Sequence, residues 1–269
     1  MKSAFTLLCG LALTPLLSAQ SLVNGTNYSD LFGPNGSSVS APAPPPVLAG
    51  VHTGSGAGPS AMGTYWDASV SGAVALSIAG LDVVTSTPKV SLDGSALHFD
   101  LVSSGALGNL AGLGAVGANW TATATFDKSG NELILQPNTT YRVSFLVDGS
   151  DGLLNQGITA NPSFTVEFLD GGGTAVGSVS NGTLVGVVGL LGTGVPSGTV
   201  TVDFVTGNTV NTTDAASLRF KAGGLATVSL LGIGDNFATV SGLSIVQVPE
   251  TSSALLGAMG ALLVLRRRR

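Results

Sequence analysis

The aromatic pair Tyr65-Trp66 is the first place where this sequence could bind a ligand. Neighbouring side chains in a strand point to opposite faces of a sheet, so one ring faces outwards if the other faces inwards. An exposed ring can cover a pyranose while nearby polar groups bind its hydroxyls. Tyr65 and Trp66 are therefore the candidate sugar-binding platform. Trp120 and Tyr141 alternate with polar residues and are expected in the core.

A second candidate site is the sequence DGSDG at residues 148–152. Asp148 and Asp151 supply two carboxylates beside turns rich in carbonyl groups, and Ca²⁺ prefers such oxygen ligands. Asp and Gly also stabilise ordinary tight turns. Calcium is the one cofactor that the sequence suggests, and a plain polar turn remains the alternative.

Catalytic patterns are weak. The sequence has no G-x-S-x-G, and neither His52 nor His98 has an evident nucleophile partner. Glu132 and Glu167 are the only glutamates before residue 250, and nothing in the sequence brings them together as a glycosidase pair. The Gly-rich segment at 112–117 lacks a surrounding βαβ unit and is expected to be a loop. We predict a protein that is not an enzyme.

The N-terminus has the pattern of a secretory signal helix. Lys2 precedes an apolar stretch at residues 4–17, and Ala19 offers a small residue for cleavage before Gln20. Signal peptidase is therefore an expected partner. Cys9 is the only cysteine and would leave with this segment. The mature chain would then contain neither disulfides nor thiolate metal sites.

The C-terminus carries a compact second signal. Pro249, Glu250 and Thr251 precede an apolar stretch at residues 254–265. The chain then ends in four arginines, Arg266, Arg267, Arg268 and Arg269. A helix of twelve apolar residues spans only ~18 Å, short of the ~30 Å hydrocarbon core, so it is a poor permanent anchor. The arginines would hold its end on the cytoplasmic side during transient membrane insertion.

This tail resembles the PEP-CTERM sorting signal of Gram-negative bacteria. The usual triplet of that family is Pro-Glu-Pro, and Thr251 occupies its third position here. The resemblance implies an exosortase, a membrane-embedded cysteine transpeptidase, as partner, and export to the cell envelope, the outer surface or the medium. The same signature sometimes carries an ice-binding label. A row of Thr121, Thr123 and Thr125 would suit ice binding, but one strand does not form an array.

Composition excludes one large class of partners. Residues 20–248 contain 14 Asp or Glu against five Lys or Arg, a net charge of −9. Phosphate contacts need clustered cations, so we expect no nucleic-acid binding. Only 9% of the chain is charged, and 39 residues are glycine. This composition, with its many Thr, Ser and Val residues, favours a β protein.

Period-two alternation predicts strands along most of the chain. Asp93-Gly94 lies between two alternating runs and predicts a hairpin. The Pro-rich segment at 40–46 cannot join a ladder and is expected to separate a short piece at 21–32 from the body. We therefore predict an N-terminal segment with a Pro-rich linker at residues 20–62 and a sandwich domain at 63–247. Later strands are expected at residues 164–169, 199–205, 217–222, 226–231 and 238–247, with a buried strand at 184–191. The residues predicted to lie inside are Phe126, Tyr141, Val143, Phe145, Phe164, Phe204 and Phe220.

The predicted fold is all-β, an antiparallel jelly-roll-like β-sandwich flanked by the signal helix and a short C-terminal membrane helix. The segments at 133–149, 164–180 and 234–247 resemble parts of galactose-binding-like jelly rolls, carbohydrate-binding modules and exported sorting-signal proteins. We therefore expect a structural or adhesive surface protein near extracellular polysaccharide. A carbohydrate-binding module with a defined sugar ligand is the main alternative, and a surface glycoside hydrolase is the second.

Overall fold

The computed structural model describes residues 20–24, 26–104, 117–126, 133–148, 159–180, 198–227 and 236–249. The predictions for the signal helix with Ala19, for Glu250, Thr251 and Arg266 to Arg269, for Asp151, and for a strand at 184–191 lie outside these residues. Within the described part of the chain, no helix is long and apolar enough to span a membrane.

The described residues form strands joined by turns and loops. In chain order the strands are β1 (Gln20–Val23), β2 (Ser38–Ser40), β3 (Ala49–Thr53), β4 (Ala57–Met62), β5 (Trp66–Ser71), β6 (Val74–Ile78), β7 (Leu81–Leu92), β8 (Ala96–Ser104), β9 (Gly117–Phe126), β10 (Thr140–Asp148), β11 (Thr159–Leu169), β12 (Ala175–Ser180), β13 (Gly198–Val205), β14 (Ser217–Thr227) and β15 (Asn236–Val248).

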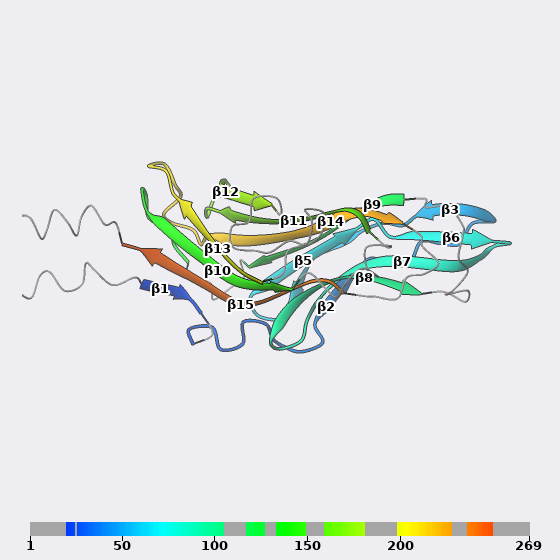
Figure 1. Ribbon diagram of the computed structural model, residues 1–269, viewed down its shortest axis with the longest axis horizontal. Helices are drawn as coiled ribbons and strands as arrows, with labels where there is room; N and C mark the ends of the chain where they lie inside the picture. The colour runs from blue at the N-terminus through cyan, green and yellow to red at the C-terminus, as the bar shows by residue number, and fades with distance from the viewer. Residues whose placement is uncertain are drawn as a thin grey trace, which may run out of the picture.

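These strands form two antiparallel sheets with one core between them (Figure 1). The nine-stranded sheet has the order β13-β10-β15-β8-β7-β6-β3, with β1 beside β15 and β2 beside β7. The six-stranded sheet has the order β12-β11-β14-β9-β5-β4. The prediction of an all-β antiparallel sandwich is therefore confirmed.

The order of the last eight strands is that of a jelly roll. From β8 to β15 every connection crosses from one sheet to the other, except the β11–β12 hairpin. The resulting halves, β8-β15-β10-β13 and β9-β14-β11-β12, form an eight-stranded double sheet. Strands β2 to β7 lengthen both halves at one end, which gives the molecule its elongated shape (Figure 1).

The N-terminal residues 20–62 belong to the sandwich, which differs from the predicted separate piece. Strand β1 pairs with the end of β15, with Gln20 opposite Gln247. Strand β2 pairs with β7, and β4 pairs with β5. The same segment contributes Val23, Leu31 and Met62 to the core. The boundary prediction failed because strands of three to six residues among Pro and Gly carry too little alternation to be recognised.

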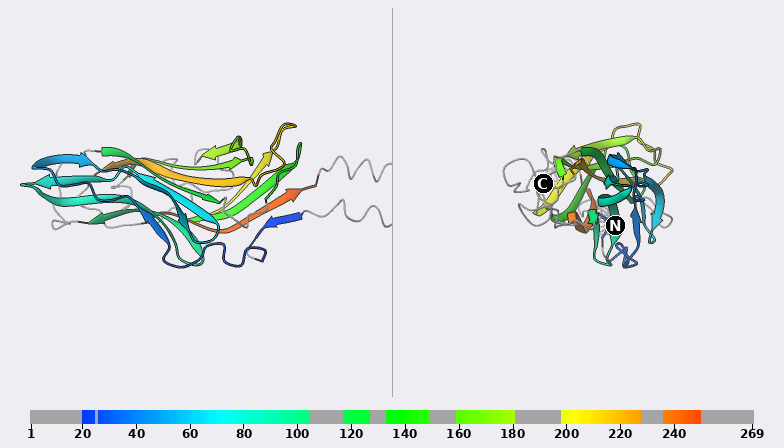
Figure 2. Two further views of the ribbon diagram at one scale, coloured as in Figure 1. Left: turned by 180° about the vertical axis from the view of Figure 1, so that it is seen from behind. Right: turned by 90° about the vertical axis from the view of Figure 1, so that its right-hand side faces the viewer.

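Both ends of the described chain lie at one pole as a result. Gln20 begins β1 and Pro249 follows β15 directly, so the pairing of these strands brings the two ends together (Figure 2). The hairpin between β6 and β7 lies at the opposite pole (Figure 1). The long axis of the molecule therefore runs from the paired ends to this hairpin.

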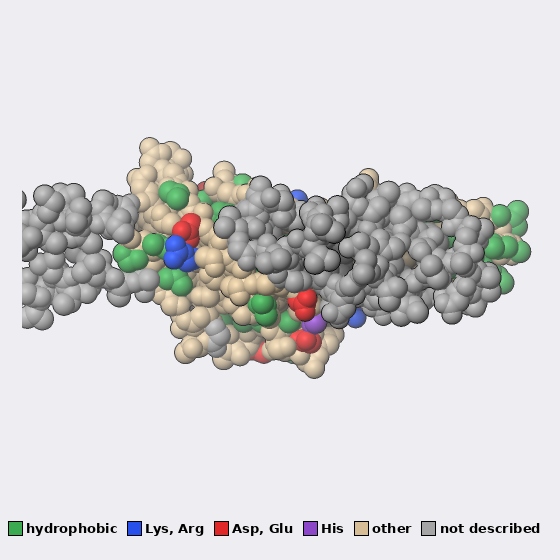
Figure 3. All heavy atoms as spheres, in the orientation of Figure 1, with side chains coloured by type: hydrophobic (Ala, Val, Ile, Leu, Met, Phe, Trp, Pro, Cys, Tyr) green, Lys and Arg blue, Asp and Glu red, His purple; other side chains and the backbone are tan. Residues whose placement is uncertain are grey.

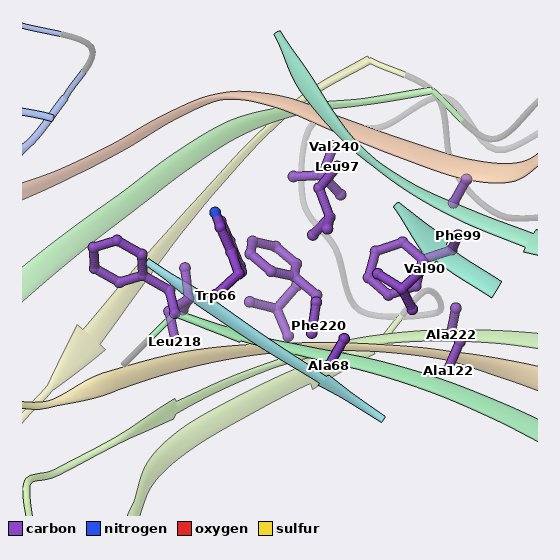
Figure 4. Packing of buried hydrophobic residues seen from close by; sticks show 14 of the residues in the cluster. Trp66, Ala68, Val90, Leu97, Phe99, Ala122, Leu218, Phe220, Ala222 and Val240 are labelled. Atoms are coloured by element: carbon purple, nitrogen blue, oxygen red, sulfur yellow. The ribbon is translucent and has the colours of Figure 1, made fainter. Parts of the chain in front are cut away.

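The core consists of apolar side chains that alternate along the strands of both sheets (Figure 4). Phe145 of β10 meets Phe220 of β14 edge to face, with ring centroids 5.1 Å apart, and joins the two sheets. The seven residues predicted to lie inside are all at most 4% exposed, and the prediction of strand faces is confirmed for them. Removing such a ring costs ~3–5 kcal/mol, so this layer dominates the stability of the domain.

Two acidic turns fix hairpins, one in each sheet. Between β7 and β8, Asp93 accepts hydrogen bonds from the backbone N–H groups of Ser95 and Ala96, both at 2.7 Å. The predicted Asp93-Gly94 hairpin is confirmed, and Gly94 adopts a φ of 92° that suits glycine. Between β11 and β12, Asp170 accepts from the N–H groups of Gly172 and Thr174 at 3.0 and 2.8 Å.

The entry to β10 is fixed by Tyr141 and Thr206. The Tyr141 hydroxyl accepts a hydrogen bond from the Gln136 N–H at 2.6 Å. Burial raises the pKa of this phenol, and the bond from Gln136 partly opposes the shift. The Thr206 hydroxyl donates to the Gln136 carbonyl at 2.6 Å and accepts from the Thr139 N–H at 2.8 Å. This network sets the register of β10 against β13.

Candidate functional site

The outer face of the six-stranded sheet gathers polar side chains from four neighbouring strands. In β5 and β9, Trp66, Ala68, Trp120 and Ala122 enter the core, so the residues between them face outwards. The registers place Asp67 opposite Thr125, Thr125 opposite Arg219, and Arg219 opposite Glu167. The next row runs from Ser69 through Thr123 and Lys221 to Thr165. We call these two rows the polar face.

A charged cluster lies on β14 and β11, at one side of the polar face. The Glu167 carboxylate lies 3.2 Å from Nη1 of Arg219 and 3.5 Å from Nζ of Lys221. Two cations thus share one carboxylate, and several of their N–H donors stay available for a ligand. Asp67, two strands from Arg219, brings the face to two positive and two negative charges. The face is therefore neutral overall despite its many charged groups.

Hydroxyl groups surround this cluster. Thr121, Thr123 and Thr125 form the row expected from the sequence, and the structure adds Ser69 and Ser71 beside them on β5. The Ser71 and Thr121 hydroxyls are hydrogen-bonded at 2.8 Å. These side chains repeat at ~4.8 Å across strands and ~7 Å along them. The threonine row is thus part of a two-dimensional array, although charged residues interrupt that array.

The predicted aromatic platform is reduced to one ring. Trp66 is fully buried, its indole stacks on Phe32, and its Nε1 donates to the Leu31 carbonyl at 2.6 Å. It cannot cover a sugar, because the N-terminal segment packs over its ring. Tyr65 is half-buried, and its ring meets Tyr28 edge to face at 5.0 Å. Tyr65 alone keeps a partly exposed ring.

The other aromatic residues are used in the core. Among the aromatics whose side chains the structure describes, every one except Tyr65 is at most 8% exposed. The buried set is Tyr28, Phe32, Trp66, Phe99, Trp120, Phe126, Tyr141, Phe145, Phe164, Phe168, Phe204 and Phe220. Polar contacts, more than stacking, are therefore what the described surface offers to a glycan.

The calcium prediction can be followed for one of its two residues. Asp148 ends β10 with an exposed side chain, opposite Thr239 of β15. Asp151 lies outside the described residues. Within the described part of the chain, no three His, Cys, Asp or Glu side chains gather as a metal site would require. Asp148 and Asp151 therefore remain a hypothesis for Ca²⁺.

The carboxylates of the polar face are poorly placed for glycoside hydrolysis. Asp67 and Glu167 are separated by three strand spacings, which sets their backbones roughly 14 Å apart. Glycosidase carboxyl groups lie ~5–9.5 Å apart. Glu132 is outside the described residues. The histidines serve other contacts: Nε2 of His98 lies 2.8 Å from the Asp93 carboxylate, and Nε2 of His52 lies 3.5 Å from that of Asp82.

The outer face of the nine-stranded sheet carries a different ion pair. Nε and Nη2 of Arg142 on β10 each donate to the Asp203 carboxylate on β13 at 2.8 Å. The hydrogen bond from Arg142 holds the pKa of Asp203 below its ordinary value. The next row holds the hydrogen-bonded hydroxyls of Ser144 and Thr201, and Leu146 and Val205 on the same two strands are 47% and 63% exposed. This face combines a closed ion pair with exposed apolar groups.

No sequence pattern could have shown the charged cluster. Arg219 and Lys221 lie two residues apart in one predicted strand, and Glu167 lies in another. Their meeting depends on the pairing of β11 with β14, which alternation alone does not determine. The only available signal was that Glu167, Arg219 and Lys221 all occupy polar positions between residues expected to face the core.

Known proteins offer little to compare with this geometry. No family model and no curated protein sequence matches the chain. Among solved structures, an apo form cyclase from Fischerella sp. matches with a TM-score of 0.32 and 11% identity over 79% of this chain and 98% of the other.

Two carbohydrate-binding modules also match. The Caldicellulosiruptor saccharolyticus module CBM27-1, solved with mannohexaose, has a TM-score of 0.29 and 15% identity over 58% of this chain and 75% of its own. TmCBM27, described for mannan recognition, has a TM-score of 0.26 and 9% identity over 59% and 79%. TM-scores this low do not establish a shared fold, so no ligand is inferred from them. The PEP-CTERM resemblance stays a prediction.

Proposed function

We propose that this protein is a non-catalytic, exported surface or matrix protein with a structural or adhesive role beside extracellular polysaccharide. The polar face of the six-stranded sheet is the surface that meets the polysaccharide. One observation carries the proposal: hydroxyl groups and the shared cluster of Glu167, Arg219 and Lys221 form a continuous, neutral array across four strands. Sugar hydroxyls both donate and accept hydrogen bonds, and this array offers both.

The chemistry of the array favours a neutral glycan and a weak contact at each sugar. A flat sheet face buries little area, and ordering a flexible chain costs entropy, so affinity comes from many repeats. The two cations are balanced by two carboxylates, so binding releases few counterions. Retention should therefore change little with salt concentration.

A matched pair of variants tests this face. The full chain is applied to the matrix polysaccharide of its host, and retention is compared with that of Arg219→Gln/Lys221→Gln. The control is Arg142→Gln/Asp203→Asn, which removes a cross-strand ion pair from the other sheet. We expect several-fold weaker retention for the first variant and wild-type retention for the second. Equal retention of all three would remove the polar face from the proposal.

Tyr65 supports a second candidate function, a carbohydrate-binding module with a defined sugar ligand. Its ring is the one described aromatic that is not buried, and an exposed ring is what can cover the apolar face of a pyranose. Tyr65→Ala should abolish capture of the ligand if this candidate holds. Wild-type capture by Tyr65→Ala together with loss in Arg219→Gln/Lys221→Gln would favour the adhesive role on the polar face.

Sorting is the remaining part of the proposal. Signal peptidase would cut between Ala19 and Gln20, and an exosortase would process the chain near Pro249 and Glu250. The support is the tail chemistry together with the position of Gln20 and Pro249 at the ends of two paired strands. The intact mass of protein extracted from the cell surface decides the matter. A species that retains Arg266 to Arg269 in a host with an active exosortase would contradict C-terminal processing.

A further inference from the structure

The pole opposite the paired chain ends is apolar. Leu48 is 82% exposed, Leu81 is 70%, Ile78 is 48% and Val47 is 37%. Figure 3 shows hydrophobic side chains gathered at this end of the molecule. Leucines exposed to this degree cost free energy in water, so a cluster of them at one extremity indicates a contact. We call Val47, Leu48, Ile78 and Leu81 the apolar tip.

Two turns hold the apolar tip together. Ile78 and Leu81 pair across the two-residue turn of the β6–β7 hairpin, in which Ala79 and Gly80 have φ values of 53° and 78°. The Gly80 N–H donates to the Leu48 carbonyl at 2.9 Å, which fixes the segment before β3 against this turn. The apolar side chains therefore project from a braced, convex end.

Charge is kept away from the surface of the tip. In β3, β6 and the first half of β7, the titratable side chains are His52 and Asp82, which are only 12% and 16% exposed. Asp82 accepts a hydrogen bond from the Ser77 hydroxyl. The tip thus offers no cation to an anionic lipid headgroup or an acidic protein.

The size of the tip decides between a protein partner and a lipid. Four side chains can bury at most a few hundred Å², whereas a standard protein interface needs ~800 Å² from each partner. A convex tip of this size suits a fluid apolar phase, into which each leucine can insert without a matching pocket. We propose that the apolar tip inserts into the surface of a lipid layer with zwitterionic headgroups. A chain held through its C-terminus would still present the tip, because it lies at the far pole.

A local reporter tests this proposal in the full chain. Leu81→Trp places an indole at the tip, and Leu146→Trp makes the same change at an exposed leucine near the end of β10. The native Trp66 and Trp120 are 0% and 1% exposed, so they give a constant background. Each variant is mixed with phosphatidylcholine vesicles whose acyl chains are brominated, and quenching of the indole fluorescence is measured.

We expect strong quenching and a blue shift for Leu81→Trp, and neither for Leu146→Trp. Adding Leu48→Ser and Ile78→Ser to the tip reporter should weaken its apparent affinity for vesicles by about tenfold or more. The proposal is overturned if Leu81→Trp is not quenched, or if both reporters are quenched equally. It is also overturned if the tip reporter shifts to the blue without lipid as protein concentration rises, because a second copy would then cover the tip.

Discussion

The two outer faces of the sandwich use ion pairs in opposite ways. On the nine-stranded sheet, one arginine meets one aspartate through two hydrogen bonds of 2.8 Å, and the pair is closed. On the six-stranded sheet, Arg219 and Lys221 share Glu167 at 3.2 and 3.5 Å, and the cluster is open. A bidentate guanidinium–carboxylate pair fixes both partners in one geometry, whereas Arg219 and Lys221 each approach Glu167 through one nitrogen and keep more of their donors for a ligand. The open cluster is therefore the better place for a ligand.

The side chains around the open cluster and the closed ion pair also differ. Hydroxyl groups flank Glu167, Arg219 and Lys221 on neighbouring strands. Beside Arg142 and Asp203, the Ser144 and Thr201 hydroxyls are hydrogen-bonded to each other at 3.3 Å. The exposed Val205 and Leu146 lie at either end of these two rows, and neither can bind a sugar hydroxyl. One sheet thus has a surface suited to hydrated polymers, and the other has a surface without that continuity. Three predictions break or sharpen this comparison.

The largest effect on stability is expected in the core, where the two sheets pack against each other. Phe145 and Phe220 meet across the core, so Phe145→Ala removes a contact on which both faces depend. The lost burial and the cavity should reduce the free energy of unfolding by ~3–5 kcal/mol. Thr123→Ala on the polar face is the control, with an effect within ~0.5 kcal/mol. Denaturant unfolding of both variants measures the difference, and equal midpoints would contradict the assigned strand faces.

The same strand faces show what could be predicted from the sequence. Alternation placed Phe145, Phe164 and Phe220 inside correctly, because the period of two is a local property of a strand. It predicted that Tyr65 and Trp66 differ in exposure, but not which one is buried. That choice depends on Leu31 and Phe32, which lie more than thirty residues away and cover Trp66.

The pairing of distant strands could not be predicted from the sequence, for a physical reason. A strand displays its polar residues whichever partner it has, so Glu167, Arg219 and Lys221 could be assigned to outer faces but not to one cluster. The N-terminal strands were missed because their residues gain stability from pairing with β15, β7, β6 and β5. Local composition therefore predicted the layers, and non-local register determined the candidate site.

The second-largest effect on stability is expected at the two acidic turns, which contain Asp93 and Asp170. Burial, the largest single influence, would raise the pKa of Asp93, but hydrogen bonds from His98, Ser95 and Ala96 together lower it below its ordinary 3.8. The pKa of Asp170 is likewise lowered by the N–H groups of Thr174, Asn211 and Gly172 against the opposing effect of burial. A lowered pKa in the folded state stabilises the fold above the ordinary value and loses that contribution as pH falls towards the folded value.

Asp93→Asn and Asp170→Asn should therefore destabilise the domain at pH 7, by about 1 kcal/mol for the more buried Asp170. The difference from wild type should shrink as pH falls below 3.8, because these carboxyl groups are then protonated in the unfolded state, while their lowered pKa values keep them ionised in the folded state. Thermal unfolding between pH 7 and pH 2.5 measures this convergence. Differences that stay constant across this range would show that the two carboxylates do not stabilise their turns through charge.

The smallest expected effect on stability is the difference in coupling energy between the closed Arg142–Asp203 pair and the open Glu167 cluster. Arg142 and Asp203 are 48% and 41% exposed, so solvent screens their attraction and the coupling should be at most ~1 kcal/mol. The coupling between Arg219 and Glu167 should be smaller still, because Lys221 keeps the Glu167 carboxylate paired after Arg219→Gln. Double-mutant cycles with Gln and Asn replacements measure both couplings by urea unfolding, once at low salt and once at about 0.5 M salt. The closed pair should lose most of its coupling in salt, and the open cluster should change little. A stronger coupling in the open cluster would mean that its donors are fully used, which would remove the physical reason for expecting a ligand there.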